Sequence, residues 1–310
     1  MSDEREEEQR RRMIEQIERE FGERRTQDVD PRVAAAFEGR ETVEPGPAPE
    51  MGPVERAPAQ QRVSLRLPLS RPRLVYAILA INVLMYGVTL ALTFSLQNTA
   101  SMSSDEAFTR VLYLLGAKYG PAIDDGQYWR FLTPIVLHGG LIHLAFNTYA
   151  LYGLGPESER IYGSGRFLAI YLLAGLAGSL ASYIRSPGLS IGASGAIFGL
   201  IGALAAFFRS ARGLIGAEAS RQQVTQLISM AAINIVLGFS VAAVDNAAHL
   251  GGLFAGGIAG YTLAPSFAVD DRVYPPVLVR VDRPARTWMW TGLILVALVG
   301  LIVAVIGRYS

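Results

Sequence analysis

The 310-residue sequence contains no cysteine. This absence excludes disulfide bonds, thiolate metal sites and a cysteine nucleophile, although it leaves the redox compartment undecided. Histidine is almost as scarce, with three copies at His138, His143 and His249. Any imidazole chemistry in this protein must therefore come from these three side chains.

Charged residues are also few. Charged residues make up 18% of the chain, whereas soluble domains carry about 25%. The net charge of +1 gives no reason to expect a nucleic-acid partner. The N-terminus opens on a dense mixture of acidic and basic residues rather than on a short apolar stretch, so we expect no cleavable signal peptide.

The sequence is rich in long apolar runs. Most of these runs are about 20 residues long, which is enough for a helix to cross a bilayer. They predict an all-α polytopic membrane protein with seven spans, near residues 74–96, 134–154, 167–184, 194–208, 224–241, 246–263 and 288–306. The long first loop contains an amphipathic segment at 107–120. We expect a charged, Pro-rich and largely disordered cytosolic tail at 1–70, a membrane core at 71–266, and a linker with a seventh span at 267–310.

Basic residues gather in alternate loops, which predicts the orientation of the chain in the membrane. The loops assigned to the cytosol carry Arg62, Arg66, Arg71, Arg73, Arg160, Arg166, Arg209, Arg212, Arg221, Arg272, Arg280, Arg283 and Arg286. The other loops carry fewer, with Arg185 in one of them and three basic residues in the long first loop. We therefore expect a cytosolic N-terminus and an external C-terminus, most simply in the plasma membrane.

The fourth span is too short to cross a bilayer. Its fifteen or so residues extend only about 23 Å, against a hydrocarbon core of about 30 Å. With one end fixed at the cytosolic surface near Arg209, the other end at Ser194 stops at depth, where irregular backbone needs protein or water around it. The sequence thus predicts a wet cavity, open to the outside, with Ser194 at its floor. Taken alone, Ser194 could equally be a helix N-cap.

Small residues mark one face of the fourth span and one face of the sixth. In and before the fourth span they are Gly192, Gly195, Gly199 and Gly202. In the sixth span His249, Gly252 and Gly256 share a face at i, i+3 and i+7. Two such faces can pack closely, and this would bring His249 to Ser194 as the base that a serine nucleophile requires. Close helix packing without chemistry is the alternative.

The second span offers donors for an oxyanion. His143 and Asn147 are spaced i, i+4 and share a face, whereas His138 is expected to point elsewhere, about 140° around the helix. An amide and an imidazole N–H, with the backbone N–H of Ser194, suit a developing negative charge. Interhelical hydrogen bonding is the alternative for this pair.

Together these residues resemble the rhomboid family of intramembrane serine proteases over about residues 74–264. The motifs that carry the resemblance are Gly192-Ala193-Ser194-Gly195, His249 followed by small residues, His143-x-x-x-Asn147, Gln127-Tyr128-Trp129-Arg130, and Glu159-x-x-x-Gly163. They occur in the order that the family has. One departure is Phe198, one turn after Ser194, where the family commonly has a tyrosine.

The resemblance implies a six-helix core with one additional C-terminal transmembrane helix. It also implies a hydrolase in which Ser194 is the nucleophile, His249 the general base and acid, and His143 and Asn147 oxyanion donors. The supporting residues would be His138, Trp129, Arg130, Glu159, Gly192, Gly195, Phe198, Gly252 and Gly256. No metal or other cofactor is expected. The substrates would be single-span or polytopic membrane proteins in the bilayer, admitted by movement of the fifth span.

Several alternatives stay open at this point. A catalytically inactive relative that binds membrane clients usually lacks the serine or the histidine, and both are present here. A transporter would show paired broken helices, and a metal enzyme would show H-E-x-x-H or an acidic partner for the histidines. Asp245, four residues before His249, could be a third catalytic member, but it more plainly marks the watery end of the sixth span.

Overall fold

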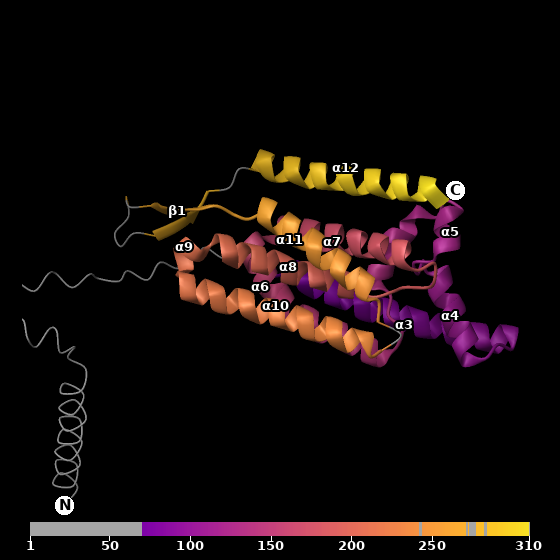
Figure 1. The fold of residues 1–310 in the computed structure, drawn as a ribbon. Helices are drawn as coiled ribbons and strands as arrows, with labels where there is room; N and C mark the ends of the chain where they lie inside the picture. The colour runs from indigo at the N-terminus through magenta and orange to yellow at the C-terminus, as the bar shows by residue number, and fades with distance from the viewer. Residues whose placement is uncertain (1–69, 242–243, 271, 273–276, 282–283, 310) are drawn as a thin grey trace, which may run out of the picture. The chain divides into compact units, whose positions relative to one another are not determined.

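A computed structural model describes residues 70–309, except for 242–243, 271, 273–276 and 282–283. Figure 1 shows that these residues form a bundle of helices with one small β-hairpin. The expectations for the tail at residues 1–69 lie outside the described residues.

Seven long helices occupy the positions of the seven apolar runs, and they confirm the all-α polytopic class. They are α3 Leu74–Ala100, α6 Leu141–Tyr162, α7 Ser164–Arg185, α8 Ser194–Ser210, α10 Ala217–Phe239, α11 Asn246–Thr262 and α12 Pro284–Tyr309. By length and composition, α3, α7, α10 and α12 can each cross a membrane, while α8 is a shorter apolar helix of 17 residues. The division into six core spans and one extra span stays a prediction.

The long first loop is folded into short helices. These are α4 Ser104–Leu114, α5 Gly120–Asp124, η1 Tyr128–Phe131 and η2 Thr133–Val136. The helix α4 begins at a capping box, in which Ser103 and Glu106 satisfy each other's backbone N–H groups. A one-turn helix, α9 Arg212–Ile215, connects α8 to α10.

One predicted boundary was wrong. The second span was expected from residue 134, but α6 begins only at Leu141, because Pro134 lies in η2 and Gly140 adopts φ +154°. The segment after the sixth span was expected to be a linker, with no strands predicted in it. It contains an antiparallel hairpin of β1 Phe267–Asp270 and β2 Val277–Arg280, in which Phe267 pairs with Arg280. Its charges and prolines concealed the short strands.

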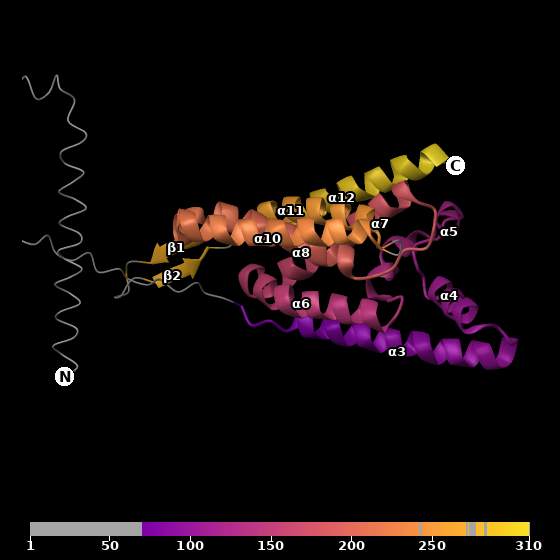
Figure 2. The ribbon, with the colours of Figure 1, turned by 60° about the horizontal axis from the view of Figure 1, so that its bottom comes forward.

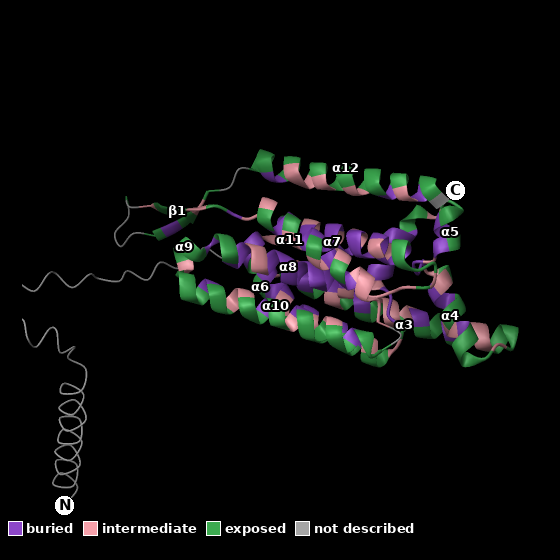
Figure 3. Ribbon diagram, in the orientation of Figure 1, coloured by how far each residue is buried: buried purple, intermediate pink, exposed green. Residues whose placement is uncertain are grey.

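The helix α8 is at the centre of the bundle. It contacts α6, α7, α10 and α11, and nearly all of its first four turns are buried. Figure 3 shows the contrast between this buried helix and the exposed surfaces of α10 and α12. Figure 2 shows α3 beside α6 on one flank, with α12 on the opposite flank next to α7 and α11.

The bundle has two ends that matter for function. The end with the β-hairpin, here the hairpin end, also holds the starts of α3, α7 and α10 (Figure 1). The opposite end, here the serine end, holds the starts of α6, α8 and α11 together with α4 and α5 (Figures 1 and 2). Successive long helices therefore begin at alternate ends of the bundle, as a membrane topology requires.

A buried carboxylate fixes the hairpin end. Glu159, in the last turn of α6, is fully buried and accepts hydrogen bonds from the backbone N–H groups at the start of α3. The donors are Arg73 at 2.9 Å, Leu74 at 3.0 Å and Val75 at 2.9 Å, with the Ser164 hydroxyl at 2.6 Å. An acidic group at a helix N-terminus satisfies otherwise unpaired donors and stabilises the helix dipole. Glu159 thus joins α3, α6 and α7.

Candidate active site

Ser194 is the first residue of α8, not its N-cap. Ala193 occupies the cap position, and no side chain caps the helix there. The alternative that Ser194 serves as an N-cap is therefore wrong. The hydroxyl is half-buried, and the first backbone N–H groups of α8 have no acceptor within the helix, as in any α-helix.

The predicted contact between the two glycine faces is present. A β-carbon added at Gly252 would overlap the carbonyl oxygen of Gly195, and one added at Gly256 would overlap the backbone of Gly199. The helix α7 joins them, since a β-carbon at Gly178 would lie 2.8 Å from the carbonyl oxygen of Ala248. Only residues without a side chain allow these backbones to touch. The turn of α11 that carries His249 is thereby pressed against the turn of α8 that carries Ser194.

The ring of His249 is held by stacking. It lies parallel to the Phe198 ring, with centroids 4.2 Å apart and an interplanar angle of 8°. His249 is 7% exposed, and its Nδ1 is buried without a hydrogen-bond partner. Among the described residues no hydrogen bond joins the Ser194 hydroxyl to this ring; such bonds often tighten only when substrate is bound. Phe198 can therefore orient the ring without offering it a hydroxyl.

Gly192 separates Ser194 from His143. A β-carbon there would lie 2.7 Å from Nε2 of His143 and 3.7 Å from Oγ of Ser194. Its φ of +122° also favours glycine, and its N–H donates to the carbonyl of Pro134 at 2.9 Å. The loop before Ser194 can thus pass directly over the imidazole.

A hydrogen bond defines which nitrogen of His143 carries the proton. Its Nδ1 accepts the backbone N–H of Gly139 at 3.3 Å. A neutral imidazole that accepts at Nδ1 carries its proton on Nε2, which is the nitrogen that faces Gly192 and the Ser194 side. His143 therefore presents a donor toward the serine.

Asn147 shares the same face of α6. Its side chain is buried, and Nδ2 donates to the carbonyl of His143 at 3.0 Å. One of its two amide protons is used in this bond, so the other is available to a further acceptor. The i, i+4 relation predicted for His143 and Asn147 holds because both lie within α6.

His138 does not point away from His143, and this prediction was wrong. The two rings are in edge contact with centroids 5.3 Å apart, and His138 is fully buried. The prediction assumed a helix through both residues, but α6 begins at Leu141 and His138 precedes it in irregular backbone. His138 therefore packs against the His143 ring edge to face.

The Trp-Arg pair lies away from the serine, in η1. Arg130 is buried and donates to the carbonyls of Tyr113 and Ala117, each at 2.8 Å, while its guanidinium covers the Tyr113 ring at 4.3 Å. Trp129 is exposed. The structure brings neither of them, nor Glu159, to Ser194: Arg130 holds the first loop together, and Glu159 acts at the hairpin end.

Asp245 has a capping role that its position in the sequence does not by itself reveal. It is the N-cap of α11, where its Oδ1 accepts the N–H of Ala248 at 3.0 Å. No hydrogen bond joins its carboxylate to the His249 ring in the described part of the chain, so the idea of a third catalytic member has no support. A polar residue directly before a predicted span is the signal that could have identified the cap.

Tyr162 was also missed. Its buried hydroxyl lies 2.7 Å from the carbonyl of Ala203 and 3.0 Å from that of Gly260, so it bridges α8 and α11 at the hairpin end. A tyrosine in the last turn of an apolar helix was the available signal. This contact maintains the α8–α11 pairing two turns beyond the glycines that meet near the serine.

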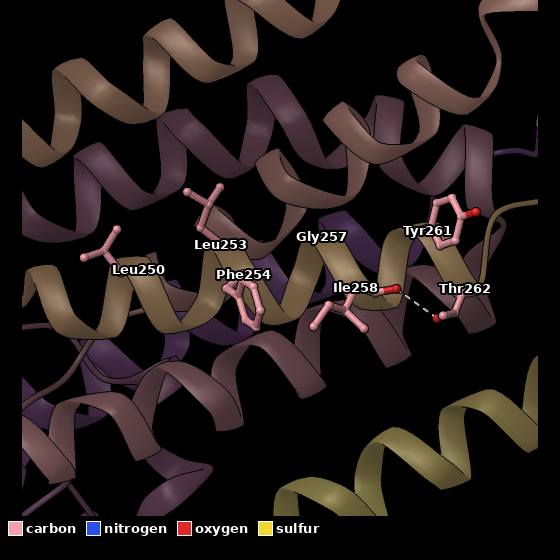
Figure 4. A pocket seen from close by; sticks show the side chains of 7 residues that line it. All are labelled: Leu250, Leu253, Phe254, Gly257, Ile258, Tyr261 and Thr262. Atoms are coloured by element: carbon pink, nitrogen blue, oxygen red, sulfur yellow. Dashed lines mark hydrogen bonds between the residues drawn. The ribbon is translucent and has the colours of Figure 1, made fainter.

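Two cavities among the described residues lie elsewhere. One, of about 510 Å³, lies between α3, α6 and α8 toward the hairpin end. The other is an apolar groove of about 740 Å³ on α11, lined by Leu250, Leu253, Phe254, Gly257, Ile258, Tyr261 and Thr262 (Figure 4). Neither includes Ser194, so the wet cavity above the serine stays a prediction.

Comparison with known proteins gives consistent results. The family model described as the rhomboid domain matches residues 125–266. Rhomboid protease GluP of Bacillus subtilis (strain 168) is 44% identical over 193 residues, which are 62% of this chain and 35% of that protein. Putative rhomboid protease YdcA of the same organism is 35% identical over 140 residues, 44% of this chain and 68% of that protein. RHOMBOID-like protein 2 of Arabidopsis thaliana is 42% identical over 142 residues, 46% of this chain and 44% of that protein.

The chain thus spans about a third of the length of the GluP protein, at 35%, and about two thirds of the YdcA protein, at 68%. The family-model match lies within the helical bundle described above, and the family is the one that the sequence motifs resemble. This chain belongs to the rhomboid family, and it is a multi-pass integral membrane protein.

Proposed function

We propose that this protein is an intramembrane serine endopeptidase that cleaves transmembrane substrate helices with a dyad of Ser194 and His249. The observation that carries the proposal is the contact of Gly252 with Gly195, which places the His249 turn of α11 against the Ser194 turn of α8. A serine that caps nothing and a histidine whose Nδ1 has no partner are both free for chemistry.

In the proposed reaction, Ser194 Oγ attacks the carbonyl carbon of a peptide bond while a ring nitrogen of His249 takes the hydroxyl proton. The tetrahedral intermediate collapses when the C–N bond breaks, and His249 returns the proton to the leaving amine. Water then attacks the acyl-enzyme ester, again losing a proton to His249. Breakage of the ester bond gives the carboxylic acid product, and His249 returns the proton to the Ser194 oxygen, which restores the hydroxyl.

The negative charge of the intermediate would be stabilised by three donors. They are Nε2–H of His143, the free amide proton of Asn147 and the backbone N–H of Ser194. The Gly139 contact of His143 Nδ1 supports this role, because it leaves the proton on the nitrogen that faces the serine. Removal of one oxyanion donor typically lowers kcat by about 10²–10³.

Substrate would enter past α10, the helix proposed to move. Only 17% of its apolar window is buried within the bundle, compared with 67% for α7. A chemical cross-link between α10 and α6 should block cleavage of a membrane substrate. If cross-linked protein cleaves at the same rate as uncross-linked protein, α10 is not the gate.

We further propose that residues 71–266 form the protease core, with the hairpin end in the cytosol and the serine end outside, in the plasma membrane. The clusters of arginine in the loops of the hairpin end support this orientation. The tail at 1–70, the hairpin and α12 would be additions to that core.

Cleavage of a single-span membrane protein by the purified chain in liposomes tests the proposed activity. Wild type should cleave, and Ser194→Ala and His249→Ala should not. Ser210→Ala is the matched control, because Ser210 is an exposed serine at the other end of α8 that donates only to the carbonyl of Ala206. If neither wild type nor any variant cleaves several tested substrates, although the protein still binds them, the protein is better described as an inactive client-binding member of the family.

A further inference from the structure

A buried lysine lies at the serine end, outside the proposed catalytic groups. Lys118, between α4 and α5, is 1% exposed although it carries a cationic side chain. Its ammonium donates to the carbonyls of Ser186 and Gly188, each at 2.8 Å, and lies 3.5 Å from the carbonyl of Ser182. These carbonyls belong to the last turn of α7 and the start of the loop that leads to Ser194. A cation at the C-terminus of a helix satisfies its unpaired carbonyls and stabilises its dipole.

The backbone of Lys118 binds the same loop. Its N–H donates to the carbonyl of Ser190 at 3.0 Å and its carbonyl accepts the N–H of Ser190 at 3.0 Å, which is an isolated antiparallel bridge. Ser190 is only four residues before Ser194. Side chain and backbone of Lys118 thus hold both halves of this loop, residues 186–193, here the serine loop.

Asp245 connects the serine loop to the histidine helix. Its Oδ2 accepts the Ser190 hydroxyl at 2.6 Å and also accepts the Ser182 hydroxyl. Its Oδ1 caps α11 through Ala248, the residue before His249, and its carbonyl accepts the N–H of His249 at 3.1 Å. One carboxylate therefore touches the loop that leads to the serine and the first turn that carries the histidine.

Both groups are charged near neutral pH. Burial lowers the pKa of Lys118 to about 8, against an opposing effect of Asp245. Burial alone would raise the pKa of Asp245, but hydrogen bonds from Ser182, Ser190 and Ala248 and the charge of Lys118 lower it overall. A buried charge is retained only where partners compensate it, and each of these charges has the other nearby along with its own hydrogen bonds.

We propose that Lys118 and Asp245 are positioning residues, which hold the serine loop and the first turn of α11 in register so that Ser194 and His249 meet. The inference rests on the proposed function. Ser194 and His249 lie on different helices that join at glycines, and glycine contacts fix the distance between backbones but leave sliding along the helix axes to other contacts. The Lys118–Ser190–Asp245 connection supplies a polar contact at the end of both helices, next to the reacting groups.

The test compares two serines of the same loop. Ser190→Ala removes the hydroxyl that reaches Asp245 and leaves both charges in place. Ser186→Ala removes an exposed hydroxyl that only accepts the N–H of Gly188, and leaves the Ser186 carbonyl for Lys118. Rates are expressed per active site, and the active sites are titrated with a serine-reactive phosphonate. Ser190→Ala should then lower kcat on the order of tenfold with KM unchanged, because a small misplacement of the reacting groups lowers the rate of the chemical step. Ser186→Ala should match wild type.

Charge variants extend the test. Asp245→Asn and Lys118→Met should each lower kcat per titrated site more than Ser190→Ala does. If either fails to fold, Ser190→Ala and Ser186→Ala still decide the question. Unchanged kcat per titrated site in Ser190→Ala would overturn the positioning role, even if its thermal stability fell.

Hydrogen exchange separates this inference from the proposed function. In Ser190→Ala, the amides of Ser190 and Ala248 should exchange faster than in wild type, while Ser186→Ala should leave both unchanged. If wild type shows no cleavage but these exchange rates respond as expected, the proposed function fails and the connection still stands as structure. If wild type cleaves and the exchange rates are unaffected by Ser190→Ala, the connection itself is refuted.

Discussion

At the scale of the residue, a few contacts orient the two imidazole rings of the candidate site. The Gly139 N–H at Nδ1 of His143 places the imidazole proton on Nε2, and the Phe198 ring fixes the plane of His249. The spacing and order of the motifs predict Ser194, His249, His143 and Asn147 as a candidate set, and the structure places the Ser194 and His249 turns in contact. It could not predict the edge contact of His138 with His143, because that contact depends on where α6 begins.

Asn147→Ala should weaken catalysis without abolishing it. The substitution removes one donor from the proposed oxyanion site, while His143 and the Ser194 N–H remain, so kcat should fall about 10²-fold. Substrate cleavage measured at saturating substrate checks this result, with labelling of Ser194 by a small phosphonate as a measure of folded enzyme. Wild-type kcat in Asn147→Ala would remove Asn147 from the site.

Gly252→Ala should separate α8 from α11. Its β-carbon would overlap the carbonyl oxygen of Gly195, a backbone atom that cannot rotate away, and overpacking of this kind costs about 1–3 kcal/mol. The His249 turn should shift, and activity should fall by about 10²-fold.

Gly257→Ala is the matched control for Gly252→Ala. The nearest atom to its added β-carbon is the Gly202 carbonyl oxygen at 3.8 Å, an ordinary contact. Alanine also favours helix over glycine by about 1 kcal/mol, so this variant should be active and at least as stable as wild type. Equal activity of the two variants would contradict the close-contact account.

At the scale of the element, a polar side chain fixes the bundle at each of its two ends, buried Glu159 at one and half-buried Asp245 at the other. Glu159 caps α3 at the hairpin end, and Asp245 caps α11 at the serine end. The positions of the helices could be predicted because apolar runs of sufficient length are visible in sequence. The residues at which the helices begin could not be predicted as well, because the start of α6, for example, depends on local turns at Pro134 and Gly140. The hairpin was missed because four-residue strands give little periodic signal.

Glu159→Gln should destabilise the bundle. The two carboxylate oxygens accept from three backbone N–H groups and the Ser164 hydroxyl. The amide keeps one acceptor oxygen, replaces the other with a donor NH₂ group and removes the negative charge. Since hydrogen bonds to charged groups contribute about 1.5–3 kcal/mol each, we expect a loss of about 2–3 kcal/mol in the free energy of unfolding. Reversible unfolding in detergent micelles measures it.

Glu157→Gln serves as the control for Glu159→Gln, because Glu157 is an exposed acidic residue two positions earlier in the same helix. Its stability should stay within about 0.5 kcal/mol of wild type, as for most surface substitutions. An equal loss of stability in both variants would show that Glu159 is not a specific cap of α3.

At the scale of the whole molecule, the topology in the membrane is the main consequence of the fold. The helices alternate between a hairpin end rich in arginine and a serine end. The family could be recognised from the sequence because five motifs occur in the order that rhomboids have. The connection through Lys118 and Asp245 could not be predicted from the sequence. It joins residues more than 120 positions apart through hydrogen bonds that leave no local pattern.

The absence of cysteine makes the topology directly measurable. Asp125→Cys at the serine end and Gly213→Cys at the hairpin end place single thiols at exposed positions in otherwise thiol-free protein. In intact cells a membrane-impermeant maleimide should label Asp125→Cys, and Gly213→Cys should react only after the cells are opened. The reverse pattern would invert the proposed orientation.

Covalent labelling of Ser194 is the most direct measurement of the central claim, that Ser194 and His249 act together as a hydrolytic dyad. A serine-reactive phosphonate applied to membranes should attach to Ser194 in wild type and in Ser210→Ala. It should not attach in Ser194→Ala, and attachment should be lost in His249→Ala because the hydroxyl then has no base. Labelling of Ser194 that persists undiminished in His249→Ala, or labelling that persists in Ser194→Ala, would contradict the dyad.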